Sequence, residues 1–101
     1  MLIVTEFGRT VAINGSRGTD HGTAGAALVA GGAVRGGRVI ADWPGLSDRA
    51  LHESRDLRPT LDLRALLKAA LVAQLGLAEA PLESKVFPDS RSVQALEGLF
   101  A

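Results

Sequence analysis

The sequence contains no cysteine, which excludes disulfides, thiolate zinc sites and cysteine nucleophiles. It also carries no net charge, because eleven acidic residues balance eleven basic ones. A chain without an excess of positive charge has no long-range attraction to nucleic acid or to an anionic membrane. We therefore expect no nucleic-acid partner and no membrane partner.

A long hydrophobic run and a leader are missing as well. No apolar stretch approaches the roughly 18 to 20 residues that span a bilayer, and Met1 runs into strand-like residues without the charged start of a signal peptide. As written, the sequence predicts a cytoplasmic protein. Residues 1–4 are all apolar, as in the central strand of a covered sheet. We therefore expect residues 1–101 to form a single domain that is the C-terminal fragment of a longer one.

Apolar residues make up 47% of the chain and gather in short runs between glycine-rich segments. Such runs predict buried strands over residues 2–5 and 26–30, separated by a turn-forming loop over residues 8–25. Two further runs, 33–35 and 38–41, flank a Gly-Gly pair, which is a good signal of a β-hairpin.

Two helices are expected in the second half of the chain. Apolar residues recur at helical spacing over residues 61–75, with Thr60 as the expected N-cap and Gly76 as the C-terminal cap. A shorter helix is expected over residues 90–99. Together these patterns predict an α/β fold that contains part of a sheet, one hairpin and two helices.

Three potential metal ligands, Glu6, Asp20 and His21, lie in glycine-flanked loops next to the two predicted strands. Carboxylate oxygens and imidazole nitrogens are the usual ligands of divalent metals in hydrolases. In an extended backbone, neighbouring side chains point in opposite directions, so Asp20 and His21 would serve two metals, or one metal and its outer shell. Arg9 lies beside them and could hold an anionic substrate through its planar guanidinium.

Each of these residues also has an ordinary structural interpretation. Asp20 can cap a turn, His21 can donate to a carbonyl, and Arg9 can pair with a nearby carboxylate. His52 has no partner pattern and is expected at the surface. No hydroxyl residue stands in a nucleophile elbow, so the sequence assigns no nucleophile.

Several motifs occur here in the same order as in an uncharacterised bacterial family, domain of unknown function 1501. These motifs are Thr5-Glu6-Phe7-Gly8-Arg9-Thr10, Asn14-Gly15-Ser16, Gly18-Thr19-Asp20-His21-Gly22, Gly31-Gly32 through Gly36-Gly37, Asp42-Trp43-Pro44-Gly45-Leu46 and Arg55-Asp56-Leu57. Over residues 1 to about 77, the chain resembles the C-terminal part of the much longer members of this family. Those members often carry a twin-arginine export signal, which implies a periplasmic location for full-length relatives.

The family is in turn similar to sulfatases and alkaline phosphatases, which place Ser-Asp-His-Gly after one strand and a later His before another. By this resemblance Glu6 corresponds to the Asp and His21 to the later His, while Phe7 stands where a His ligand is usual. The resemblance implies a partial alkaline-phosphatase-like sheet and an ancestral metal-dependent hydrolase of phosphate or sulfate esters.

The predicted function is accordingly part of such a hydrolase site. Glu6, Asp20 and His21 would bind zinc, manganese or calcium, and Arg9 would contact the substrate. The competing hypothesis is a non-catalytic remnant or interaction domain that keeps the fold without the activity. The flank of the first predicted strand is left unpaired, and an exposed strand edge invites pairing with another copy. We therefore also expect a homo-oligomer.

Overall fold

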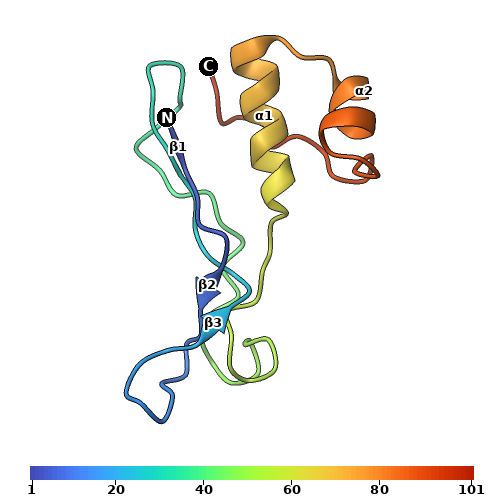
Figure 1. The fold of residues 1–101 in the computed structure, drawn as a ribbon. Helices are drawn as coiled ribbons and strands as arrows, with labels where there is room; N and C mark the ends of the chain where they lie inside the picture. The colour runs from blue at the N-terminus through green and yellow to red at the C-terminus, as the bar shows by residue number, and fades with distance from the viewer. The chain divides into compact units, whose positions relative to one another are not determined.

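The computed structural model describes residues 1–101, which form a small mixed α/β protein with two antiparallel sheets and two helices (Figure 1). The elements, in chain order, are β1 (Leu2–Ile3), β2 (Gly8–Arg9), β3 (His21–Gly22), β4 (Leu28–Val29), α1 (Leu63–Leu75), α2 (Glu79–Pro81) and the π-helical stretch η1 (Leu82–Val86). No helix has the length and apolar character needed to cross a membrane.

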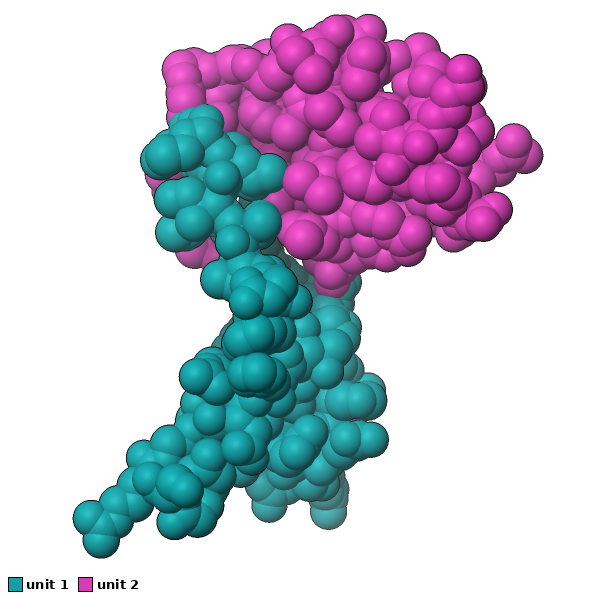
Figure 2. Space-filling model, viewed as in Figure 1, with its two compact units in different colours: residues 1–30, 40–60 teal, residues 31–39, 61–101 magenta.

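The chain divides into two units, each of which draws on two separate segments (Figure 2). Unit 1 consists of Met1–Ala30 and Ile40–Thr60, and unit 2 consists of Gly31–Val39 and Leu61–Ala101. Most of the buried apolar side chains belong to unit 2, namely Ala65, Leu66, Ala69, Leu82 and Leu99. Unit 1 buries Leu51 together with the polar residues Thr10 and Asp56, so its backbone and polar contacts hold much of its structure.

Unit 1 is built on two short antiparallel pairs of strands. β1 pairs with β4, so that Leu2 faces Val29 and Ile3 faces Leu28. This pairing confirms the positions of the two predicted strands, in shorter form. Their predicted burial is wrong, because the sheet has only two strands and Ile3 and Leu28 are exposed. β2 pairs with β3 in the same antiparallel sense. The sequence predicted only a loop for this region, because half of the residues in β2 and β3 are glycines, which strands disfavour.

The predicted hairpin over residues 33–41 is wrong. In unit 2 the backbone of residues 33–35 pairs instead with residues 99–101. The Arg35 amide donates to the Leu99 carbonyl at 2.9 Å, and the Ala101 amide donates to the Ala33 carbonyl at 2.8 Å. Val34 and Phe100 form the bridge between them. A partner more than sixty residues away thus replaces the local one, and a local turn signal contains no information about such a partner.

Helix α1 begins two residues later than predicted and ends as predicted. Its N-cap is Asp62 rather than Thr60, because the Asp62 carboxylate accepts from the Arg64 amide at 2.9 Å. Gly76 closes the helix in the left-handed conformation, with φ 63°, and its amide donates to the Val72 carbonyl at 3.0 Å.

The predicted helix over residues 90–99 is also wrong. Lys68, on the buried face of α1, donates through Nζ to the carbonyls of Ser90 at 2.7 Å and Val93 at 2.8 Å. The Leu96 amide donates to the Ala65 carbonyl at 2.9 Å. Residues 90–96 are therefore bonded to α1 in an irregular conformation. The Ser90 carbonyl also accepts from the Val93 amide at 2.9 Å, which closes a single turn that does not continue as a helix.

Asp62 gives the start of α1 a testable dependence on pH. Hydrogen bonds from the Arg64 side chain and amide lower the pKa of Asp62 from 3.8 to about 2. The ionised Asp62 carboxylate therefore contributes fully to the free energy of unfolding above about pH 4, and this contribution is lost as the pH falls towards 2. We expect Asp62→Ala to cost about 1 kcal/mol at neutral pH, as loss of an N-cap does. Thermal unfolding followed by far-UV circular dichroism measures both effects.

The matched variant is Asp62→Asn, which keeps a capping oxygen and removes the charge. It should retain most of the stability at neutral pH and lose the dependence on acid between pH 4 and 2. Equal stability of Asp62→Ala and the unmodified chain would show that the cap contributes nothing.

Candidate functional site

Strands β2 and β3 form a two-stranded ribbon in unit 1, the β2–β3 ribbon (Figure 1). Arg9 lies directly opposite His21 in its register. Cross-strand partners share one face of a sheet. Phe7 joins them, because its ring stacks on His21 with centroids 3.8 Å apart and an angle of 24° between the planes. The guanidinium carbon of Arg9 lies 5.9 Å from the centroid of the Phe7 ring. We call this exposed set, Phe7, Arg9 and His21, the ribbon face.

Arg9 contacts no carboxylate. Its Nη1 donates to the Thr19 carbonyl at 3.1 Å. The ion pairs of the chain are formed by other residues, Arg64 with Asp62 and Arg91 with Glu83. The structural interpretation of Arg9 as the partner of a nearby acid is therefore wrong, and its guanidinium keeps further N–H groups for an anion.

Asp20 forms part of the turn between β2 and β3. Its Oδ1 accepts from Asn14 Nδ2 at 3.0 Å, and the Oδ1 of Asn14 accepts from the amides of Ser16 and Gly18, each at 3.0 Å. The Asp20 amide donates to Thr10 Oγ1 at 3.1 Å. Asn14 therefore caps the turn amides, and the Asp20 carboxylate holds the Asn14 side chain. Glu6, by contrast, is exposed and makes no hydrogen bond or ion pair.

A tight turn at residues 52–56, which we call the clamp turn, is a second part of unit 1, besides the β2–β3 pairing, whose structure the sequence did not indicate. The amide of His52 donates to the Asp56 carbonyl at 2.8 Å, and the Arg55 amide donates to the His52 carbonyl at 3.1 Å. Glu53 and Ser54 between them have φ angles of 53° and 54°. Two successive positive values define a type I′ turn, which usually requires Gly or Asn. As predicted, His52 itself is exposed.

The clamp turn ends in a buried carboxylate. Only 2% of Asp56 is exposed, and one of its oxygens, Oδ2, accepts from the Thr23 amide. The other, Oδ1, is buried without a hydrogen-bond partner. The hydrogen bond from Thr23 holds the pKa of Asp56 below its ordinary value, although burial acts in the opposite direction. The carboxylate is therefore charged at neutral pH.

Residues 1–87 match the model of a family described as "Protein of unknown function (DUF1501)". The chain belongs to this family. All the strands and helices lie within the matched region, which confirms the family assignment made from the ordered motifs. No curated protein and no solved structure matches the chain.

The DUF1501 chain does not assemble a complete metal centre from its own side chains. Nowhere do three or more His, Asp or Glu residues come close enough to hold a metal ion. Asp20 lies just before β3, and its carboxylate is already bound to the Asn14 side chain. The donors that are present do not fit a full ligand set, so no reaction step can be assigned to a metal held by this chain alone.

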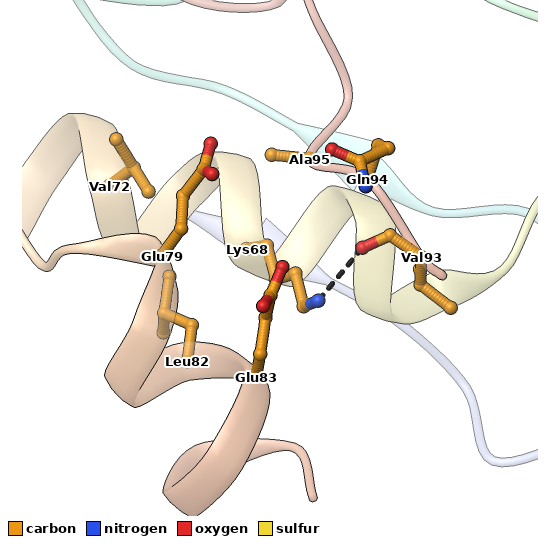
Figure 3. A pocket seen from close by; sticks show the side chains of 8 residues that line it. All are labelled: Lys68, Val72, Glu79, Leu82, Glu83, Val93, Gln94 and Ala95. Carbon is orange, nitrogen blue, oxygen red and sulfur yellow. Dashed lines mark hydrogen bonds between the residues drawn. The ribbon is translucent and has the colours of Figure 1, made fainter. Parts of the chain in front are cut away.

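Unit 2 of the DUF1501 chain contains a shallow hollow beside α1 (Figure 3). It is lined by Lys68, Val72, Glu79, Leu82, Glu83, Val93, Gln94 and Ala95. Lys68 is the only one of these that carries a buried charge, and its ammonium is bound to two backbone carbonyls. The hollow therefore presents a structural lysine rather than a free amine.

Proposed function

We propose that the chain supplies part of a metal-dependent hydrolase site for phosphate or sulfate esters. The observation that carries this proposal is the register of the β2–β3 ribbon, which presents His21 and Arg9 together on one exposed face. An imidazole can serve as one ligand of a metal, and a guanidinium beside it can contact the anionic oxygens of an ester.

Each residue has a distinct role in this proposal. His21 would be the imidazole ligand of zinc, manganese or calcium, and Arg9 would contact the substrate anion. Glu6 is free of other partners and would be a carboxylate ligand. Asp20 would act from the outer shell, since its carboxylate already holds Asn14. The remaining ligands and a nucleophile would come from residues outside this chain, so the proposed site is shared.

A non-catalytic remnant or interaction domain is the second candidate. Phe7 favours it, because this residue stands where a His ligand is usual in the related hydrolases and covers one face of the His21 ring. An aromatic ring in van der Waals contact with an imidazole stabilises the ribbon without any metal. The two candidates differ in whether metal binds to His21.

The test is a zinc titration of the chain followed by NMR of its two histidines. His21 and His52 are both exposed, and His52 has no other candidate ligand assigned to it, so it serves as the internal control. We expect zinc to shift the ring signals of His21 at lower concentration than those of His52. Inorganic phosphate or sulfate should then shift the side-chain N–H signal of Arg9.

The matched variants are His21→Ala and His52→Ala. Only the first should abolish the high-affinity phase of the zinc titration. Zinc that binds His52 as readily as His21 would contradict the hydrolase proposal and leave the non-catalytic role.

We also propose that β1 mediates a homo-oligomer. The β1–β4 sheet has only two strands, so each strand has one edge without a partner. The exposed apolar side chains of Met1, Ile3 and Leu28 belong to this sheet or its end. Backbone pairing across such an edge would join two copies. Light scattering should show an oligomer, and a monomer that persists at high protein concentration would rule this assembly out.

A further inference from the structure

The clamp turn contacts both strands of the β2–β3 ribbon just beyond their ends. The Arg55 carbonyl accepts from the Val11 amide at 3.0 Å, and the Asp56 carboxylate accepts from the Thr23 amide. Val11 follows β2 and Thr23 follows β3. A single turn of five residues thus fixes the exit of each strand.

The Asp56 carboxylate also lies directly against β3. A Cβ atom placed on Gly22 would be 2.6 Å from Asp56 Oδ1, so only a glycine leaves room for the carboxylate. Gly22 is the neighbour of His21, and neighbouring positions of a strand face opposite ways. Asp56 therefore supports the face of β3 opposite to the His21 ring.

This arrangement is costly to maintain. Asp56 Oδ1 is buried without a partner, and such an atom forfeits its hydration. Glu53 and Ser54 hold positive φ angles that non-glycine residues disfavour. Unsatisfied polar atoms and backbone strain of this kind persist where the surrounding structure enforces them, and they gather at functional sites.

We propose that Asp56 is a positioning residue, whose carboxylate fixes the Gly22–Thr23 backbone and thereby sets the His21 ring against Phe7 on the ribbon face. The inference deepens the proposed function and rests on it, since His21 is the metal ligand of that site. Asp56 itself does not touch the metal or the substrate.

The test compares Asp56→Ala, Asp56→Asn and the exposed control Asp48→Ala by NMR, first without metal. In Asp56→Ala, Thr23 amide exchange should become faster by on the order of tenfold or more. The ring signals of His21 should move towards those of an unstacked histidine. Zinc, added next, should shift the His21 ring signals only at a higher concentration than in the unmodified chain. Asp56→Asn keeps an acceptor for Thr23 and should be intermediate, and Asp48→Ala should be unchanged.

Unaltered His21 ring signals in Asp56→Ala, with unit 1 still folded, would overturn the positioning role. If Asp56→Ala unfolds unit 1, the His21 ring signals are compared in Asp56→Asn instead. Loss of the His21 stacking in this folded variant would support the positioning role, and unchanged stacking would overturn it. The zinc titration of the unmodified chain tests the proposed function separately from the role of Asp56. If zinc shows no preference for His21 in that chain, the proposed function fails. The ring signals of His21 without metal then still test whether Asp56 positions the ring.

Discussion

Replacing Gly8 by alanine is expected to destroy the β2–β3 ribbon. A Cβ atom at this position would lie 1.6 Å from the carbonyl oxygen of Ala24, which is backbone and has no flexible end to move aside. The strands would have to separate, and with them the pairing of Arg9 and His21. We expect a loss of stability in unit 1 at or above ~3 kcal/mol, the upper end of the usual cost of overpacking.

Gly15→Ala provides the matched control. Gly15 lies in the same unit, and a Cβ atom there would meet nothing within 4 Å. The cost of this substitution should stay within about 0.5 kcal/mol. Amide exchange at Thr10, which donates to the Asp20 carbonyl across the ribbon, measures both variants. Similar exchange at Thr10 in the two variants would show that the close approach of Gly8 to Ala24 is not a constraint.

Lys68→Met should produce the second large effect, this time in unit 2. The substitution keeps an apolar stem of similar length but removes both hydrogen bonds to the carbonyls of Ser90 and Val93. Ser90 is fully buried, and without Lys68 its carbonyl would keep only the hydrogen bond from the Val93 amide at 2.9 Å. The Val93 carbonyl, which is part-buried, would lose its partner, and the loss of both bonds to the ammonium should cost about 1 to 3 kcal/mol, partly offset because a charge is no longer buried.

The only other lysine, Lys85, is exposed and gives a control with the same chemical change. Lys85→Met should alter the free energy of unfolding by no more than about 0.5 kcal/mol. Urea unfolding followed by far-UV circular dichroism monitors α1 in both variants. Equal midpoints for the two would show that the irregular path of residues 90–96 does not depend on Lys68.

Features encoded within a few neighbouring residues could be predicted from the sequence. The apolar stripe and Gly76 define α1 and its end, and the short apolar runs identify β1 and β4. The segments that were missed depend on distant partners. Residues 33–35 pair with residues 99–101, and the conformation of residues 90–96 depends on hydrogen bonds from the buried Lys68 ammonium. Hydrophobic periodicity reports which face a segment buries and does not report which segment covers it.

The candidate site shows the same division. Arg9 and His21 were selected by residue type and nearby glycines, and the register then placed them opposite one another. Asp56 was visible only as part of a family motif, because nothing local marks an acid whose partner, Thr23, lies 33 residues earlier. The positive φ values at Glu53 and Ser54 fall on residue types that give no turn signal of this kind.

Because the segments of the two units alternate along the chain, the two units can complete their folding only in a fixed order during translation. Residues 1–60 include every segment of unit 1, so both of its strand pairs can close while the chain is still being translated. Gly31–Val39 emerges in the middle of that stretch, yet its backbone partners, residues 99–101, are made about sixty residues later. At translation rates of about 5 to 20 residues per second, this segment waits for seconds with its hydrogen-bonding groups open. A nascent chain therefore exposes Gly31–Val39 to chaperones and to other chains after unit 1 is already able to fold.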